Sequence, residues 1–333
     1  MEEQTIRQAL AMYGLEVGEI VAIQKGYRNQ SHVVRLADNQ LRNLILYKSE
    51  PGSLGRIKRA NAISDFLADH GFPARQTTDK RILQIKAGDT IKYAALYTYL
   101  PGHTIPWEAY TKEHLKLLGQ TMSNIHAALY AFQTTDLPAV SDEYDTILQQ
   151  MQSYFNNPSI LDALKHKLNL TVKPQELGWL ANVIRACATP GHHQALHMDL
   201  VRSNVLFERY TDGRIHITGI LDLEKTAAGD PLFDIARTLA FLLVDCKYKT
   251  ERQVRKYFLY SGYNKRGKAH IQDRLIRTKN DTVSLLETLV DLFLCFDLYK
   301  FLRHNPYEFL EQNEHFARTK QQLLSRGIIQ HLP

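Results

Sequence analysis

Three polar residues are closely spaced in and after the stretch LHMDLVRSNVLF, residues 196–207. Asn204 follows Asp199 after five positions, and Asp222 comes 18 positions later, at the end of the second strand of a predicted hairpin. Phosphoryl transfer needs a carboxylate near the attacking hydroxyl and metal ligands that hold the nucleotide phosphates in line. Mg²⁺ prefers oxygen ligands, chiefly carboxylates, phosphate and water. The spacing therefore predicts Asn204 and Asp222 as metal ligands, and Asp199 as the group that orients and deprotonates an acceptor hydroxyl.

Each of these polar residues also has a structural interpretation. An isolated Asp before an apolar run is typical of a turn or a helix N-cap. Asp230 and Asp234, further along in GDPLFDIAR, fit a turn cap and an N-cap as well as they fit a functional role. A zinc site is a further interpretation, because three histidines lie close together in the sequence: His192, His193 and His197. No Cys or further His follows at ligand spacing, so the sequence argues against zinc.

The composition indicates a globular protein with a modest positive charge. The 333 residues are 44% hydrophobic and 23% charged, and the formal net charge is +6. The basic residues are spread along the chain without an aromatic-basic module, which argues against nucleic acid as a partner. The most apolar run, residues 239–244, is too short to span a bilayer. Three widely spaced cysteines and the polar start MEEQTIRQAL complete the prediction of a cytoplasmic protein without a membrane partner.

The first hundred residues combine short strands with two helices. Helical periodicity predicts helices over residues 3–12 and 55–69, the second ending at Gly71 as a C-cap glycine would. Apolar and β-branched runs predict five strands, three between residues 19 and 48 and two in RILQIKA and IKYAALYTYL. This segment is expected to form a mostly antiparallel sheet.

From residue 111 onward the apolar periodicity is helical. Only two further strands are predicted, NVLFERY and HITGILDL. The sequence therefore predicts an α+β protein with a β-rich lobe at residues 1–100 and a mainly helical lobe at residues 103–333, joined by a hinge at residues 97–102. A ligand is expected to bind in the cleft between two such lobes.

The motif H-x-D-x-x-x-x-N followed by ILDLEKTAAGDPLFDIAR resembles the aminoglycoside phosphotransferase and choline kinase family. The stretches ALYTYLPGHT and LGQTMSNIHAAL are similar to that family as well, so the resemblance covers most of residues 20–245. It implies a two-lobed protein-kinase-like fold. It also implies a kinase that uses ATP or GTP with Mg²⁺ to phosphorylate a hydroxyl of a small molecule.

The resemblance implies a role for each residue of the loop and hairpin. Asp199 would be the catalytic base. Asn204 and Asp222 would hold the metal ions, and Asn204 would thereby belong to the catalytic residues. His197 would support the loop without transferring protons. Asp230 and Asp234 would support the same region structurally.

The resemblance also implies a nucleotide site in the β-rich lobe. Lys48 matches the strand lysine that pairs with the α- and β-phosphates. Gly26 and Asn29 match the loop that covers the nucleotide. The adenine would be lined by backbone groups of three hinge residues: Tyr97, Tyr99 and Leu100.

Two features depart from the family pattern. The nucleotide-covering loop has the single glycine Gly26 instead of a glycine-rich run. The helix at residues 55–69 lacks the Glu that many relatives place opposite the strand lysine, and either Asn61 or Asp65 could take its place.

Acceptor specificity is expected in the C-terminal helices. Glu287 and Asp291 stand four residues apart and share a helix face, which could bind a cationic acceptor such as an aminoglycoside or an amino alcohol. Glu224 could contact substrate or metal. For all three residues a surface position is equally consistent with the sequence.

The sequence leaves alternatives to this interpretation. The stretch AALYTYLPGHT is also similar to homoserine kinases, so homoserine is an alternative acceptor. Choline-type and macrolide-type acceptors are also possible. A protein kinase is disfavoured, because no D-F-G and no A-P-E follow the loop. A catalytically silent nucleotide-binding regulator would explain the missing Glu, but the intact Asp199, Asn204 and Asp222 argue against it. The sequence leaves ATP versus GTP and the oligomeric state open.

Overall fold

The chain divides into two compact units in the computed structural model, which describes residues 2–25, 29–88, 90–172, 177–188, 193–265 and 281–331. The first unit comprises Met1–Thr104 and Ser203–Lys225, and the second comprises Ile105–Arg202 and Thr226–Pro333. The stretch Ser203–Lys225 therefore packs with the N-terminal residues, although a single division near residue 100 would leave it with the helices.

A five-stranded antiparallel sheet forms the centre of the first unit, in the order β1-β2-β3-β5-β4. Its strands are β1 (Val17–Lys25), β2 (Asn29–Leu36), β3 (Leu41–Lys48), β4 (Leu83–Ala87) and β5 (Thr90–Thr98). The predicted α+β class and the β-rich character of this part of the chain are confirmed.

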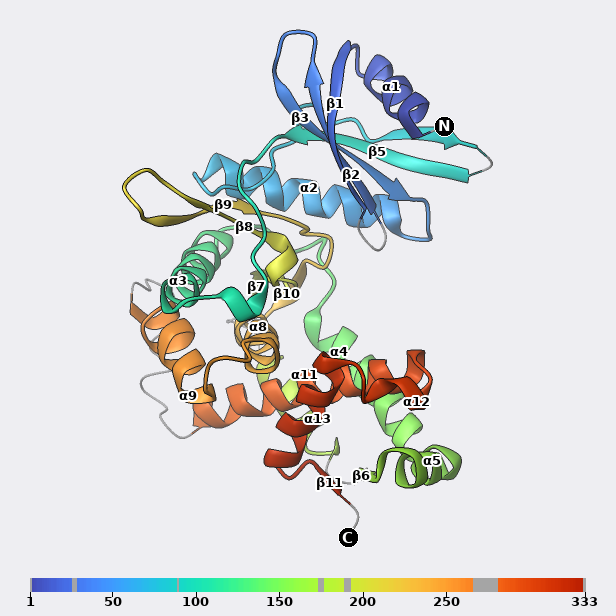
Figure 1. Cartoon of the computed structure of the whole chain (residues 1–333), viewed down its shortest axis with the longest axis vertical. Coiled ribbons are helices and arrows are strands. Elements are labelled where there is room, and N and C mark those ends of the chain that lie inside the picture. Colours follow the sequence, from blue (N-terminus) through green and yellow to red (C-terminus); the bar gives the residue numbers. More distant parts are fainter. Residues whose placement is uncertain are drawn as a thin grey trace. The chain divides into compact units, whose positions relative to one another are not determined.

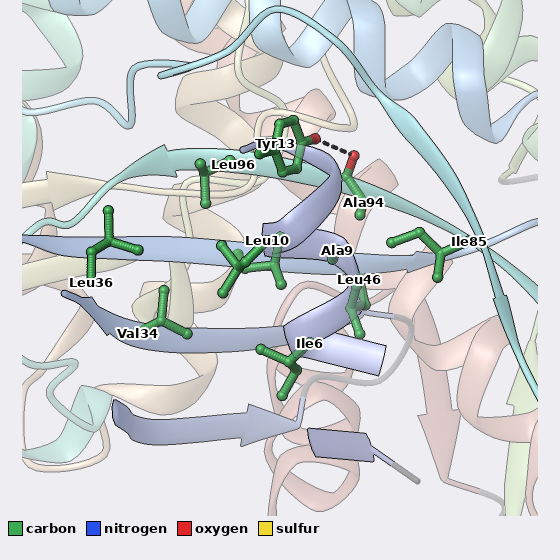
Figure 2. Close-up of a cluster of buried hydrophobic side chains, with 11 residues drawn as sticks. Ile6, Ala9, Leu10, Tyr13, Val34, Leu36, Leu46, Ile85, Ala94 and Leu96 are labelled. Carbon is green, nitrogen blue, oxygen red and sulfur yellow. Dashed lines mark hydrogen bonds between the residues drawn. The ribbon is translucent and has the colours of Figure 1, made fainter. Parts of the chain in front are cut away.

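Two helices cover opposite faces of this sheet, α1 (Glu2–Met12) and α2 (Ser53–Asp69) (Figure 1). In Figure 2, Ile6 and Leu10 of α1 pack on strand residues such as Val34, and the Tyr13 hydroxyl donates to the Ala94 carbonyl at 2.9 Å. Ile57 of α2 packs on the other face. Side chains alternate along each strand, so neighbouring residues of β3 contribute to different helix–sheet layers.

The hairpin of β8 (Val205–Arg209) and β9 (Ile215–Ile220) completes the first unit. It pairs with the segment that follows β5, because His103 and Phe207 exchange backbone hydrogen bonds of 3.1 and 2.9 Å. Gly102 adopts φ +102 there, and a Cβ at this position would lie 2.3 Å from Thr218 Oγ1 and 2.9 Å from the Phe207 carbonyl oxygen. Only glycine fits this close approach.

The second unit is mainly helical, as the sequence predicts. Its helices are α3 (Lys112–Leu129), α4 (Val140–Phe155), α5 (Pro158–Leu168), α7 (Leu180–Cys187), α8 (Leu232–Asp245), α9 (Glu251–Val254), α11 (Asp281–His304), α12 (Tyr307–Leu310) and α13 (Glu314–Ser325). Its short strands pair antiparallel, β7 (Gln194–Leu196) with β10 (Ala227–Gly229) and β6 (Leu170–Val172) with β11 (Ile329–His331). Within the described ranges, no helix is long and apolar enough to cross a membrane.

Candidate active site

The loop that carries Asp199 is anchored by a buried carboxylate of α8. Asp234 lies in the first turn of that helix, and its two oxygens accept the backbone N–H groups of His197 and Met198, both at 2.8 Å. Met198 adopts φ 59, a left-handed conformation that is strained for a side chain of this size. Asp234 therefore fixes the backbone directly before Asp199 and offsets the strain. Asp230, near the same helix start, accepts the Leu232 N–H at 3.0 Å.

Asp234 is held in turn from α3. The His126 ring lies 3.1 Å from Asp234 Oδ2, the oxygen that also accepts the His197 N–H, and 2.8 Å from the hydroxyl of Tyr263. All three side chains are buried. Burial alone would raise the pKa of Asp234, but the hydrogen bond and charge of His126, with His197, hold it below its usual range. The carboxylate is therefore ionised, as an acceptor of several N–H groups must be.

Asp199 is buried close to a second charged group. Its backbone N–H donates to Nδ1 of His197 at 3.2 Å. Arg237 of α8 pairs with Asp297 at 3.3 Å. Burial would lower the pKa of Arg237, but the carboxylates of Asp297 and Asp199, with Tyr144, raise it above its usual value. The Asp199 carboxylate thus lies in the field of a buried guanidinium.

The β8–β9 register places the two predicted metal ligands at the same end of one hairpin. Val205 pairs with Ile220, and the Leu221 N–H donates to the Asn204 carbonyl at 2.9 Å. Asp222 therefore comes directly after the residue that is bonded to Asn204. Asp222 adopts φ 57, a left-handed backbone conformation, so the chain turns away from the direction of β9 at this residue.

Glu224 extends this hairpin end into a small pocket of the first unit. Its carboxylate accepts the side-chain N–H of Asn29, the first residue of β2, at 2.5 Å. Burial and the neighbouring Asp222 carboxylate raise the pKa of Glu224 to about 7, although Arg56 and Arg75 act in the opposite direction. Sequence reasoning paired neither arginine with this site, because neither belongs to a motif.

Tyr47 is the last β3 side chain on the sheet face that carries Ile45 and Tyr97. Lys48 follows it, is exposed and pairs across the sheet with Lys92. Lys48 nevertheless lines a small pocket together with Asn29, Arg56 and Glu224. Its role towards nucleotide phosphates stays a prediction.

Asn61 and Asp65, the two candidates for the missing Glu, have different partners. The Tyr97 hydroxyl donates to Asn61 Oδ1 at 2.7 Å and lies 2.8 Å from the Tyr47 hydroxyl. Asp65 accepts the backbone N–H and the hydroxyl of Thr77 at 2.7 and 2.6 Å. Asn61 therefore faces the pocket with Asp222 and Glu224, whereas Asp65 fixes the strand-like segment beside β5.

The remaining nucleotide-site predictions lie around β5 and β2. Tyr97 is the next-to-last residue of β5 and is buried, and Tyr99 and Leu100 follow the strand. Gly26 lies outside the described residues. The Tyr97 side chain belongs to the protein interior, so any contact with a base at this residue would be through its backbone.

Glu287 and Asp291, the predicted acceptor residues, bind arginines of the same unit. Arg255 pairs with Glu287 at 2.6 Å, and Arg326 pairs with Asp291 at 2.9 Å and with Glu287 at 3.4 Å. Glu251 joins the same network through both arginines. A cationic acceptor would have to displace an arginine to reach either carboxylate.

The donor set at the hairpin end fits a divalent cation of the Mg²⁺ type. Asp222 and Glu224, which line one pocket, would supply carboxylate oxygens, and Asn204 at the same hairpin end would supply an amide oxygen. No group of three or more His, Cys, Asp or Glu side chains that could hold a metal ion occurs in the described part of the chain. An ion held here would therefore need further oxygens, as Mg²⁺ commonly takes from phosphate and water.

Comparison with solved structures shows the same fold at low sequence identity. An amicoumacin kinase in complex with AMP-PNP and Ca²⁺ matches with a TM-score of 0.68 and 14% identity, covering 98% of this chain and 96% of that one. A thermostable aminoglycoside phosphotransferase mutant with AMP-PNP and hygromycin B gives 0.60 and 14%, covering 96% and 99%. A microcompartment-associated aminopropanol kinase gives 0.62 and 12%, covering 97% and 98%.

Sequence comparison identifies the family directly. No curated protein matches the chain significantly. The model of the phosphotransferase enzyme family matches residues 19–262, which is well over half of the chain and includes every described residue of the loop and hairpin site. The predicted family, the kinase-like fold and the enzyme class are thereby confirmed: the chain belongs to the phosphotransferase enzyme family.

Proposed function

We propose that the protein transfers the γ-phosphoryl group of ATP or GTP to a hydroxyl of a small, amine-bearing acceptor. The observation that carries this proposal is the hairpin register, which brings Asn204 and Asp222 to one end of β8–β9 beside Glu224. An amide and two carboxylates at one end of a hairpin are of the ligand types that suit a Mg²⁺–nucleotide complex. The two similar structures solved with AMP-PNP support the choice of a nucleotide as co-substrate.

The residues of the second unit have the proposed task of directing the acceptor. Asp199 would accept the proton of the attacking hydroxyl, and Asp234 would hold the loop through the backbone of His197 and Met198. Mg²⁺, when bound, would neutralise charge on the phosphates. Asn204 and Asp222 would hold that ion, and Lys48 and Asn29 would contact the nucleotide from the first unit.

An amino alcohol is the acceptor class with the most support. One similar structure is named as an aminopropanol kinase and another contains the aminoglycoside hygromycin B. Homoserine and choline are the next candidates, since each combines a hydroxyl with a cationic nitrogen. The predicted cytoplasmic location belongs to the same proposal, because ATP and GTP are cytoplasmic co-substrates.

A panel of turnover assays tests the proposal. Purified protein is incubated with ATP or GTP and Mg²⁺ against aminopropanol, aminoglycosides, homoserine, choline and sugars, with the Asp199→Ala variant in parallel. We expect one acceptor class to raise nucleotide consumption at least about 100-fold above the variant, in the range typical of lost general-base catalysis. Nucleotide binding without turnover on any acceptor would instead favour the regulator interpretation.

A further inference from the structure

Tyr47 is the β3 residue that lines the pocket with Asn61, Asp222 and Glu224, and its side chain is uncharged. Tyr47 and Tyr97 lie on one sheet face with their hydroxyls 2.8 Å apart, and Tyr97 donates its only hydroxyl proton to Asn61. Tyr47 must therefore be the donor to Tyr97. Burial raises the pKa of Tyr97 to about 12 and that of Tyr47 well above its usual value, so both are neutral. This hydrogen-bonded chain cannot balance the charge of phosphate groups.

Arg75 brings a positive charge into the same pocket. Its guanidinium lies 5.3 Å from the centre of the Tyr97 ring, and Arg75 lines the pocket with Asn61, Asp222 and Glu224. Its backbone carbonyl accepts the Ser64 hydroxyl, which ties the segment to α2. Among the described residues, the Arg75 guanidinium forms no ion pair within salt-bridge distance, so its charge is available to a ligand.

Arg56 approaches Glu224 from the first turn of α2. Its guanidinium donates to the Ser53 hydroxyl at 2.9 Å and lies 3.9 Å from Glu50. It lines a pocket with Lys48 and Glu224. Arg56 and Arg75 therefore each line a pocket that contains Glu224, and the pocket of Arg75 also contains Asp222.

We propose that Arg75 and Arg56 bind the phosphate groups of the nucleotide, and that the Tyr47–Tyr97–Asn61 chain positions Arg75. The inference rests on the proposed nucleotide-dependent function and adds two phosphate-binding residues to the predicted Lys48. A guanidinium offers a planar pair of N–H donors that matches phosphate oxygens, and stacking on a tyrosine ring orders it in advance. Phosphate oxygens would then supply Arg75 with a counter-charge and would add to that of Glu50 at Arg56.

Isothermal titration calorimetry of the full chain with Mg²⁺ tests this proposal. The probes are a non-hydrolysable ATP analogue, tripolyphosphate and adenosine. For Arg75→Gln and Arg56→Gln we expect the analogue and tripolyphosphate to bind at least about tenfold more weakly, as loss of one charge-assisted contact implies, with adenosine unchanged. Arg75→Lys keeps the positive charge but lacks the planar pair of N–H donors, so it should restore part of the lost affinity. It also serves as the test variant if Arg75→Gln does not fold.

Two control variants match these changes. The Arg81 guanidinium lies 5.4 Å from the Tyr13 ring in the same unit but on the α1 side, and it pairs with Asp79 at 2.6 Å. Arg81→Gln therefore removes a ring-stacked arginine charge outside the pocket. Lys58→Gln removes an exposed charge from α2. Neither should alter the affinity for the analogue or for tripolyphosphate.

The outcomes separate this inference from the proposed function. If Arg75→Gln and Arg56→Gln bind the analogue as tightly as the unchanged protein, the inference is wrong and the function stands. Equal losses for adenosine and the analogue would show a merely structural effect and also overturn it. Tripolyphosphate binding that depends on Arg75 without nucleotide binding would support the phosphate site and contradict the proposed function. If the unchanged protein binds none of the probes, both fail.

Discussion

The carboxylate of Asp234 accepts the backbone N–H of His197 at 2.8 Å, although 37 residues separate them in the sequence. The other carboxylate oxygen accepts the N–H of Met198, which has the positive φ of 59. The loop before Asp199 is therefore held by a buried charge on α8, and the ring of His126 on α3 contacts the same oxygen that accepts the His197 N–H.

Asp234→Asn is expected to loosen this loop. An amide has one acceptor oxygen where the carboxylate has two, and it removes the charge that His126 faces, so the free energy of unfolding should fall by about 2–4 kcal/mol. Urea denaturation measures this, and turnover should fall together with stability. Asp142→Asn, at an exposed position of α4, is the control. An Asp234→Asn protein as stable as the control would show that the carboxylate does not hold the loop.

Asp222→Asn is expected to weaken metal-dependent nucleotide binding without unfolding the protein. The change removes one charged oxygen at the hairpin end, where Asn204 and Glu224 remain, so the affinity for the Mg²⁺–nucleotide complex should fall about tenfold or more. Titration of nucleotide at several Mg²⁺ concentrations measures the effect. Asp212→Asn in the turn of the same hairpin should change nothing. Unaltered Mg²⁺ dependence in Asp222→Asn would make the metal assignment wrong.

Gly102→Ala is expected to destabilise the first unit more than another glycine substitution at positive φ. Gly102 has φ +102 and lies against Thr218 and Phe207, whereas Gly14 has φ +75 and open space within 4 Å of the position that a Cβ would take. Gly14→Ala should cost about 1 kcal/mol from backbone strain alone. Gly102→Ala adds a clash with backbone and should cost at least about 3 kcal/mol. Equal melting temperatures for the two variants would contradict the close approach.

Asp291 should make the stability of the second unit depend on pH. Burial raises its pKa from 3.8 to about 6, against the opposing effect of Arg326. Between these two pH values the folded protein retains a proton that the unfolded chain has released. The contribution of Asp291 is therefore present below about pH 4 and is lost as the pH rises through about 6.

Denaturation of Asp291→Asn across this pH range checks that sign. The variant should lose the part of the pH dependence that arises from Asp291 and show a flatter profile than the unchanged protein. Asp136→Asn, at an exposed position, should keep the original profile. A variant profile that still falls between about pH 4 and about pH 6 with the original slope would contradict the assignment.

Local patterns were sufficient to predict most of the elements and the family. Helical periodicity predicted α2 and its end at Gly71, which has φ +80, and apolar runs predicted all five strands of the sheet. The spacing of Asp199, Asn204 and Asp222 is a property of continuous sequence. Such signals can be read from one chain because each arises within a few turns or one hairpin.

Contacts between distant segments could not be predicted from sequence. The hydrogen bond between Asn29 and Glu224 joins residues 195 positions apart, and β7 and β10 are three residues long, too short for a periodic signal. Arg326 meets Asp291 only because α13 returns beside α11. Helical spacing predicted that Glu287 and Asp291 share one helix face, and both contact Arg326. The arginine partners themselves come from distant parts of the chain.

The most direct measurement of the central claim is phosphoryl transfer to the acceptor itself. Mass spectrometry of the acceptors, after incubation with nucleotide, Mg²⁺ and either the unchanged protein or Asp199→Asn, detects the phosphorylated product. The account predicts a phosphorylated hydroxyl compound with the unchanged protein and at least about 100-fold less with Asp199→Asn, while the variant still binds nucleotide. Equal amounts of product from both proteins would contradict the role of Asp199, and no product from any acceptor would contradict the proposed kinase.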